Sequence, residues 1–436
     1  MMTVAEVKMW GHLVGAVAWD ENANLAVFEF TRSFKSLQWD IAPFTLPISS
    51  TQYIFRFPEL RRKNTPELDT FKGLPGLLAD ALPDRYGNEL MNMWLTQNGR
   101  PINSMNPVEM LCFMGNRGMG ALEFEPGALV ENKKSRRLEI ESLVEMADRL
   151  LNQKQSFRTN LQEGEEQALA EILRIGTSAG GARPKAVVAY HEKTGEVRSG
   201  QALAPKGFEH WLIKLDGVRD IQLGDSHDYG RVEMAYYQMA IDCGIEMMPC
   251  RLLEENGRAH FMTKRFDRED GDIKHHIQTF CALKHFDYNL IEHYSYEQLF
   301  QTMRELGLPY PSAEQMFRRM VFNVLAKNCD DHTKNFSFRL KQGGQWELAP
   351  AYDICHAYQP KHRWVSQHAL SVNGKRQQIT TDDLIQVGNS IRTQKMKPKE
   401  IIQEISDIIR EWKKYADQNS IPAKLRDAIA ETHQFA

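Results

Sequence analysis

Apolar residues recur with helical periodicity along most of the second half of the chain. In segment 313–327, Met316, Met320 and Val324 share one face, and Ser312 with Gln315 resembles the capping box that opens a helix. Near the end, an apolar stripe occupies positions 401, 405, 408, 409 and 412. Such stripes are typical of amphipathic helices that pack on a core, so we expect residues 266–436 to be mainly helical.

Segment 176–265 has the pattern of a strand-rich region with one inserted helix. Residues 186–190 and 211–215 are largely apolar, with the β-branched side chains that favour buried strands. Asn256-Gly257 separates two further apolar runs, and this dipeptide tolerates the positive φ angles of a tight hairpin turn. Between these strands, the pattern of residues 231–243 predicts a helix.

The preceding residues contain short strand patterns followed by helical pieces, and a turn signal at 125–127 precedes a charged run. We therefore expect an N-terminal subdomain over 1–130, a strand-rich lobe over 131–265 and a helical lobe over 266–436. Strand-rich and helical regions that are segregated along the chain predict an α+β fold.

Composition narrows the class of protein. The 436 residues are 42% hydrophobic and 25% charged, as in ordinary globular proteins, and the net charge of −3 lacks the basic excess of a protein that binds nucleic acid by itself. Six scattered cysteines form no CxxC pair, which favours reduced thiols. The first residues lack a signal-peptide pattern, and no apolar stretch approaches the roughly 20 residues that span a bilayer. We expect a cytoplasmic protein without membrane contact.

The candidate chemistry centres on Asp330 and on Asn335 five residues later. An Asp and an Asn at this offset, followed by a second Asp, are the carboxylate beside the attacking hydroxyl and the Mg²⁺ ligands of protein kinases. Here a predicted hairpin over 336–348 leads to Asp353. In this interpretation Asp330 orients the substrate hydroxyl, Asn335 and Asp353 bind Mg²⁺, and Lys334 contacts the γ-phosphate. A polar turn capped by Asp330 and held by Asn335 explains the local pattern equally well.

The upstream lobe favours the kinase interpretation. A Gly-rich loop at 176–181 precedes Lys185, and glycines let backbone N–H groups approach phosphate closely, although a plain surface loop has the same composition. Lys214 lies in an apolar strand, where an ammonium needs an anionic ligand or a carboxylate such as Glu233 on the next helix. Gly loop, strand Lys, helix Glu and then Asp, Asn and Asp follow the order of protein kinases.

At these positions the chain resembles the HipA family, the kinase toxins of bacterial toxin–antitoxin pairs. The resemblance is carried by the catalytic stretch 330–337, the metal stretch 348–354, the hinge 264–268 and the phosphate loop 178–185, with weaker likeness at 82–85 and 115–122. It implies a two-lobed protein-kinase-like fold with a HipA-type N-terminal subdomain. It also implies additional ATP-binding residues in the phosphate loop, the hinge and the catalytic stretch: Gly180, Gly181, Ala182, Arg183, Lys185, Lys264, Arg265, Phe266 and His332.

The resemblance further implies a function. ATP and Mg²⁺ would be the cofactors, Ser178 the autophosphorylation site, and an aminoacyl-tRNA synthetase the protein substrate. A HipB-like helix-turn-helix antitoxin would be the partner, and it would supply most of the contact with operator DNA. Two alternatives stay open from the residues alone: a kinase of small molecules or lipids, and a catalytically weak co-repressor of the antitoxin.

Overall fold

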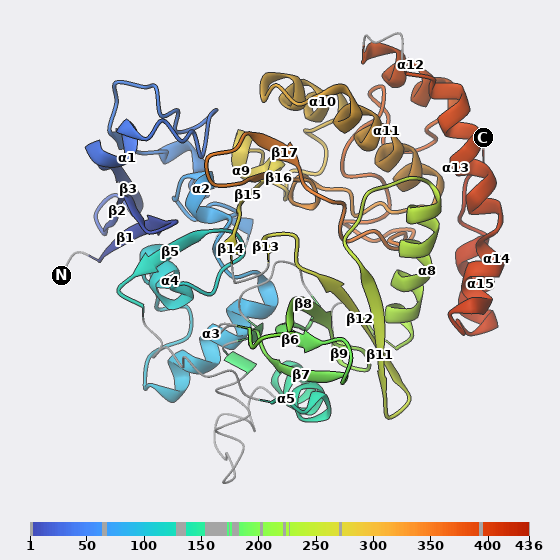
Figure 1. The fold of residues 1–436 in the computed structure, drawn as a ribbon, viewed down its shortest axis with the longest axis horizontal. Helices are drawn as coiled ribbons and strands as arrows, with labels where there is room; N and C mark the ends of the chain where they lie inside the picture. Colours follow the sequence, from blue (N-terminus) through green and yellow to red (C-terminus); the bar gives the residue numbers. More distant parts are fainter. Residues whose placement is uncertain are drawn as a thin grey trace. The chain divides into compact units, whose positions relative to one another are not determined.

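The structure is a computed structural model, and it describes residues 3–62, 68–127, 137–152, 172–173, 175–176, 183–200, 204–220, 224–225, 227–269, 273–391 and 396–435. Contacts divide the chain into two compact units (Figure 1). The first unit comprises Met1–His227, Arg251–Ile277 and Lys341–Gly343, and the second comprises Asp228–Cys250, Gln278–Leu340 and Gly344–Ala436.

The first unit begins with an antiparallel sheet of five strands in the order β4-β3-β2-β1-β5. Its strands are β1 (Val4–Met9), β2 (His12–Asp20), β3 (Leu25–Phe30), β4 (Ile54–Phe55) and β5 (Leu122–Glu125). Burial alternates along β2 because successive side chains point to opposite faces. Gly15 is needed where strands approach closely, since a Cβ there would lie 2.1 Å from the carbonyl oxygen of Glu29.

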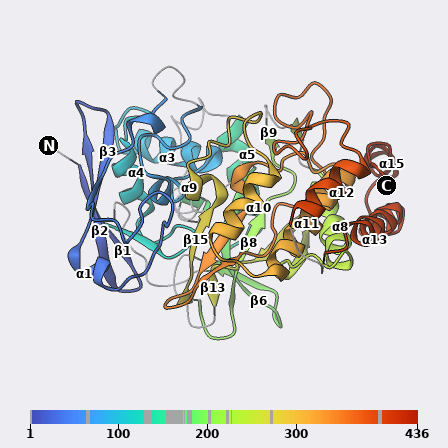
Figure 2. The same cartoon turned by 90° about the horizontal axis from the view of Figure 1, so that it is seen from above.

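Short helices accompany this sheet, and α4 lies against β1, β2 and β5, as Figure 2 shows from above. A capping box at α4 joins the Asn106 side chain to the Glu109 backbone and the Glu109 side chain to the Asn106 backbone. The helical segments here are α1 (Arg32–Ser36), η1 (Pro58–Leu60), α2 (Gly76–Ala79), α3 (Arg85–Gln97) and α4 (Pro107–Met114).

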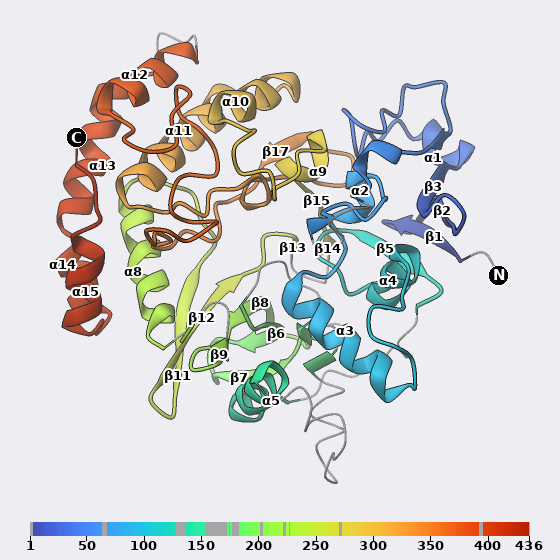
Figure 3. The same ribbon diagram turned by 180° about the vertical axis from the view of Figure 1, so that it is seen from behind.

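A second antiparallel sheet follows, with the order β11-β12-β8-β6-β7. Its strands are β6 (Lys185–His191), β7 (Glu196–Ser199), β8 (Glu209–Lys214), β11 (Cys250–Glu255) and β12 (Arg258–Lys264). Asn256 and Gly257 have φ angles of 46° and 77°, so the predicted hairpin turn is confirmed. Residues of α3 and α5 (Ile140–Asn152) share a buried apolar cluster with β6 and β8, and Figure 3 shows α5 beside the sheet.

Short strands complete the first unit in two antiparallel ribbons. The pairs are β9 (Arg219–Asp220) with β10 (Gly224–Asp225), and β13 (Arg268–Glu269) with β14 (Ile273–Lys274). The chain passes from the first unit to the second within β15 (His276–Thr279).

The second unit is mainly helical, and it confirms the expected class of the chain's last third. Helix α11 contacts α10 and α13, while α8 lies against α13 and α14. The helices are α8 (Tyr229–Asp242), α9 (Phe280–Lys284), α10 (Tyr296–Glu305), α11 (Tyr310–Leu325), η3 (Thr333–Asn335), α12 (Thr381–Ser390), α13 (Pro398–Arg410), α14 (Trp412–Gln418) and α15 (Ala423–Ala430). Mainly antiparallel sheets in one unit and mainly helices in the other confirm the α+β prediction.

One predicted helix start is wrong. Helix α11 begins at Tyr310 after Pro309, without a side-chain cap, so Ser312 lies inside it. Gln315 is used elsewhere: it accepts from the backbone N–H of Glu246 (2.8 Å) and donates to the carbonyl of Gly244 (2.7 Å). The side chain thus binds the loop after α8 rather than the end of its own helix.

The predicted hairpin after Asn335 is present. Strands β16 (Ser337–Leu340) and β17 (Trp346–Leu348) pair antiparallel, with Phe338 opposite Leu348. Among the residues that the structure describes, every helix is too short or too polar to cross a membrane.

Candidate functional site

Asp330, Asn335 and Asp353 come together in the second unit. The side-chain amide of Asn335 donates to the backbone carbonyl of Asp330 at 2.6 Å. Asn335 and Asp353 both line one small polar pocket. The Asp330 side chain is 47% exposed, so its carboxylate is accessible from solvent. Asn335 therefore links the other two residues: it contacts the Asp330 backbone and shares the pocket with Asp353.

Local elements explain this convergence. After α11 ends, Asn328 forms an isolated β-bridge with Ala357. The chain then turns through η3, whose N-cap residue His332 accepts a hydrogen bond from the Lys334 N–H at 3.3 Å. Strands β16 and β17 then reverse the chain. The reversal returns Asp353 to the pocket that Asn335 lines.

Asp353 has an unusual backbone conformation. Its φ of 52° lies in the left-handed region, which non-glycine residues adopt at a cost in free energy and which Asp tolerates better than most. Its backbone carbonyl accepts a 3.4 Å hydrogen bond from the side-chain amide of Asn328. The surrounding structure therefore holds the residue in this conformation.

Charged and aromatic groups surround Asp330. The ring Nε2 of His332 lies 3.6 Å from Asp330 Oδ1, and the Lys334 ammonium lies 4.8 Å from the ring centre of Tyr288. The Tyr352 hydroxyl donates to the Lys334 carbonyl at 2.7 Å. Lys334 is thus held by its backbone, while its ammonium extends over an aromatic face.

Asp331, which directly follows the exposed Asp330, is buried and accepts hydrogen bonds from groups inside the fold. It accepts hydrogen bonds from the Tyr296 hydroxyl (2.9 Å), from His368 Nδ1 (2.9 Å) and from the Ala369 N–H (2.7 Å). Burial alone would lower the pKa of His368, but the Asp331 carboxylate and Cys329 raise it to about 10. An imidazolium–carboxylate pair therefore lies beneath the site at neutral pH.

Arg319 is a buried cation on the same side. It lines the pocket with Asn335 and Asp353, and burial lowers its pKa to about 10, so it stays charged at neutral pH. Its Nε is buried without a hydrogen-bond partner among the described residues. A guanidinium that faces the pocket makes it more attractive to acidic groups.

The predicted phosphate-binding lysines lie in the first unit. Lys185 on β6 is buried, 3.8 Å from the Asp84 carboxylate, and it pairs across the sheet with Lys214 on β8. The Lys214 ammonium lies 5.7 Å from the ring centre of Phe261. Two cations at opposing positions favour an anion nearby.

The other predicted residues of the nucleotide site belong to the phosphate loop and to α8. Ser178, Gly180, Gly181 and Ala182 lie outside the described residues, while Arg183 lies two residues before the start of β6. Glu233 lies on α8 in the second unit, so its pairing with Lys214 stays a prediction.

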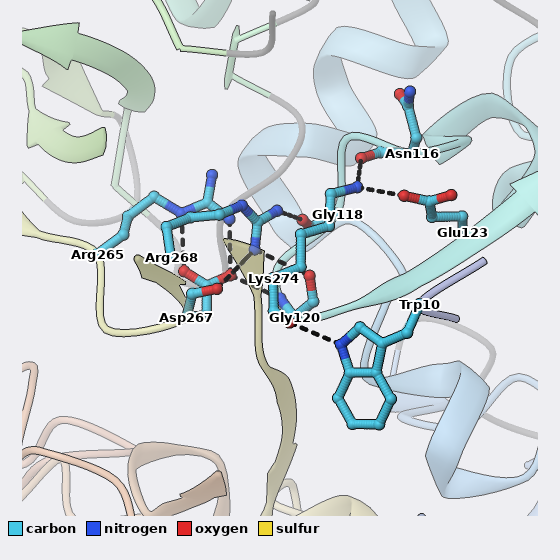
Figure 4. Close-up of polar contacts among 9 residues, drawn as sticks. All are labelled: Trp10, Asn116, Gly118, Gly120, Glu123, Arg265, Asp267, Arg268 and Lys274. Carbon is cyan, nitrogen blue, oxygen red and sulfur yellow. Dashed lines mark hydrogen bonds and ion pairs between the residues drawn. The ribbon is translucent and has the colours of Figure 1, made fainter. Parts of the chain in front are cut away.

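The predicted hinge, 264–268, is held by buried charges (Figure 4). The Arg265 guanidinium binds both carboxylate oxygens of Asp267 at 2.9 and 2.7 Å. Lys264 forms a partly exposed pair with Glu209 at 2.6 Å. Asp267 also accepts from Arg268 and from the Gly120 N–H, both at 2.7 Å. The Arg265 guanidinium is thus committed to Asp267, and the Arg265 backbone N–H donates to the carbonyl of His210 at 2.9 Å. Phe266 is partly exposed.

Sequence reasoning missed the buried polar residues behind the site, chiefly Arg319, Asn323 and Asn328. A signal for them exists, since Asn323 interrupts the apolar run 320–326, and Arg319 and Asn328 lie just before and just after that run. Buried polar groups of this kind need hydrogen-bond partners, so their presence in an apolar run indicates a specific polar contact.

Comparisons with known proteins identify the family of the chain. The family model described as the HipA N-terminal domain matches residues 5–125, and that of the HipA-like C-terminal domain matches residues 177–412. Among solved structures, the chain is similar to HipA in the toxin–antitoxin complex of HipA, HipB and operator DNA from Shewanella oneidensis MR-1. That match has 16% identity and a TM-score of 0.65, and covers 98% of this chain and 94% of the other.

A second solved structure, the Helicobacter pylori proinflammatory kinase CtkA, matches with 13% identity and a TM-score of 0.33, over 58% of this chain and 92% of the other. At that score we draw nothing from it. No curated protein sequence matches the chain.

Proposed function

The chain belongs to the HipA-like family, and from this premise we propose that it is an ATP-Mg-dependent serine/threonine protein kinase and the toxin of a toxin–antitoxin pair. The observation that carries the proposal is the gathering of Asp330, Asn335 and Asp353 at one place in the second unit. Phosphoryl transfer requires this set: a carboxylate beside the attacking hydroxyl and oxygen ligands for the metal.

The donor set fits Mg²⁺. Asn335 uses its amide nitrogen for the Asp330 carbonyl, which leaves Oδ1 as the atom for a cation, and Asp353 supplies a carboxylate. No cluster of three or more His, Cys, Asp or Glu that would form a closed metal cage occurs in the described ranges. Mg²⁺ is commonly held by one or two protein oxygens, with phosphates and water completing its shell. When bound, it would neutralise charge on the transferred phosphoryl group.

The residues around this site take the remaining roles in our proposal. Asp330 accepts or orients the proton of the substrate hydroxyl, and its exposure leaves room for a protein side chain. His332 lies beside that carboxylate, and Lys334 provides a positive charge for the γ-phosphate. Both residues are positioned by η3.

In our proposal most nucleotide-binding residues belong to the first unit, and Glu233 belongs to the second. Arg183, Lys185 and Lys214 would bind phosphates, together with the backbone of Gly180, Gly181 and Ala182. The hinge residues Lys264, Arg265 and Phe266 would contact adenine, and Glu233 would hold Lys214. Ser178 is our candidate for autophosphorylation, because a phosphate there adds about −2 charge beside the ATP phosphates and would expel the loop.

The partner and substrate are also proposals. The Shewanella protein was solved with HipB and operator DNA, which supports a HipB-like helix-turn-helix antitoxin as the partner of this chain. We propose an aminoacyl-tRNA synthetase as the protein substrate and the cytoplasm as the place of action.

Incubation of the purified chain with labelled ATP and a cell lysate tests the activity. We expect a labelled protein band that falls at least about 100-fold in Asp330→Ala, because a positioned acid or base contributes about that much or more. Asp407→Ala, on the exposed face of α13, is the matched control and should keep full labelling. Phosphoproteomics of cells that express the wild type or Asp330→Ala would then identify the substrate.

Other outcomes decide between the alternatives. Label in small molecules or lipids instead of protein would favour a different kinase, and nucleotide binding without transfer would favour a co-repressor. For autophosphorylation, Ser178→Ala should remove the phosphate seen by mass spectrometry. Phosphate that persists on Thr177 would contradict the choice of Ser178.

A further inference from the structure

Four buried polar side chains behind the acids form one continuous chain of hydrogen bonds. The Tyr296 hydroxyl bonds Asp331 at 2.9 Å, Asn323 Nδ2 bonds the Tyr296 oxygen at 3.0 Å, and Asn328 Nδ2 bonds Asn323 Oδ1 at 3.0 Å. The four residues have between 0% and 3% of their surface exposed. They come from α10, from α11, from the turn after α11 and from the catalytic stretch.

The Asp331 carboxylate, at one end of this chain, only accepts hydrogen bonds, and this determines which group donates in each of the other bonds. The Asp331 carboxylate only accepts, so the Tyr296 hydroxyl must donate to it and can only accept from Asn323. Asn323 therefore turns its NH₂ to Tyr296 and its Oδ1 to Asn328. As a result, the Asn328 amide must present N–H groups on this side, and one of them faces the carbonyl of Asp353 at 3.4 Å.

This last bond reaches a residue whose backbone lies in the left-handed region, which is unfavourable for a non-glycine residue. Asp353 is held at a φ of 52°, and its carbonyl lies at the end of a chain that begins beside Asp330. We propose that Asn328 is a positioning residue for Asp353: it fixes the backbone of the metal-binding acid relative to the catalytic stretch. This inference rests on the proposed function, because it assumes that Asp353 binds Mg²⁺.

A packing role alone explains the arrangement less well. Well-packed apolar residues in place of buried polar groups are often neutral or stabilising, so a polar chain is an expensive way to fill a core. Here the chain links two segments whose relative position decides the metal site. Coupled hydrogen bonds of this kind also hold one geometry more strictly than apolar contacts.

Metal-dependent nucleotide binding tests the proposal. The dissociation constant of the full chain for a non-hydrolysable ATP analogue is measured with Mg²⁺ and with EDTA, and the ratio gives the metal-dependent gain. In Asn328→Ala we expect this gain to fall about tenfold, the worth of one buried hydrogen bond, while affinity in EDTA stays within about twofold. Asn328→Asp keeps the side-chain shape but replaces the donating amide by a carboxylate, which only accepts hydrogen bonds at neutral pH. It should show the same loss.

Asn419→Ala is the matched control. Asn419 is also buried, and its amide donates to Gln238 (2.7 Å) and to the Tyr415 carbonyl (2.8 Å), far along the chain from the acids. It should lower the melting temperature as Asn328→Ala does and leave the metal-dependent gain unchanged.

The outcomes separate the inference from the proposed function. If wild type binds the analogue with a Mg²⁺-dependent gain that Asp353→Asn abolishes, and both Asn328 variants keep that gain, the positioning role is wrong and the kinase proposal stands. A wild type without any Mg²⁺-dependent gain would overturn both. An equal loss of the gain in Asn419→Ala would also overturn the positioning role, since global destabilisation would then explain it.

Discussion

At the residue scale, burial and the neighbouring side chains together set the charge of the groups near the site. Asp331 and His368 are both nearly inaccessible; burial lowers the pKa of His368, but Asp331 and Cys329 raise it to about 10. Asp330 directly precedes Asp331 but is half-exposed. Two adjacent acids are thus divided between a structural pair and the reaction we propose.

The Asp331–His368 pair predicts a pH dependence of stability. The folded-state pKa of His368 is raised from 6.5 to about 10, so the pair's contribution is fully present below about pH 6.5 and is lost as the pH rises towards 10. In that window the free energy of unfolding should fall by up to about 1.4 kcal/mol per pH unit on this account. Urea unfolding of wild type and His368→Gln between pH 6 and 10 measures it.

The variant should lose this part of the pH dependence, while His293→Gln, an exposed histidine, should keep it. An identical pH slope in wild type and His368→Gln would show that the pair is not charged in the folded protein.

At the element scale, buried charges tie the hinge to the N-terminal sheet of the first unit. Asp267 binds Arg265 and Arg268, and Arg268 donates to the carbonyls of Gly118 and Gly120, which precede β5 (Figure 4). Burial opposes the charge of Asp267, but the two arginines hold its pKa well below the usual range. Lys274 on β14 adds a second tie through Glu123 at 2.6 Å.

Loss of the Asp267 charge should be costly. Asp267→Asn leaves two buried guanidinium groups without their anion, so we expect the free energy of unfolding to fall by about 3 kcal/mol or more. Denaturant unfolding followed by circular dichroism checks this. Glu192→Gln breaks the exposed pair with Arg251 and should cost at most about 1 kcal/mol. Equal, small effects of both variants would mean that the tie contributes little.

At the scale of the whole molecule, the residues that we propose for catalysis and for nucleotide binding belong to different units. The acids and the amide lie in the second, while Lys185, Lys214 and the hinge lie in the first. Segments of the sequence alternate between the units, so each unit is built from chain pieces far apart in sequence. The net charge of −3 leaves the molecule without a basic excess for DNA.

That charge predicts how operator DNA is bound. The chain alone should bind DNA with a dissociation constant no tighter than about 1 µM at physiological salt, because few phosphates are neutralised. With the antitoxin present, nanomolar binding is expected. Fluorescence anisotropy with labelled operator DNA measures both, with antitoxin alone as the control. Nanomolar, steeply salt-dependent binding by the chain alone would contradict the antitoxin's role as the main DNA contact.

Features set by neighbouring residues were predictable from the sequence. Asn256-Gly257 specifies its hairpin turn because the two residues tolerate positive φ, and the Asp330–Asn335 contact spans only five positions. The stripe at 401–409 predicted α13, although the helix ends at Arg410 and Trp412 begins α14. The predicted cap at Ser312 is wrong, because the helix begins at Tyr310 and the Gln315 side chain bonds a distant loop instead.

The sequence by itself therefore predicted the fold class and the contact between Asp330 and Asn335, since periodicity and short spacing are local properties. The roles of the acids stay proposals. Only the tertiary structure decided that Asp331 pairs with His368, 37 positions away, and that Asn323 joins Tyr296, 27 positions away. Nothing in the spacing of these residues marks them as partners. Packing brings them together, and a buried polar group must then bond to whichever partner the fold provides.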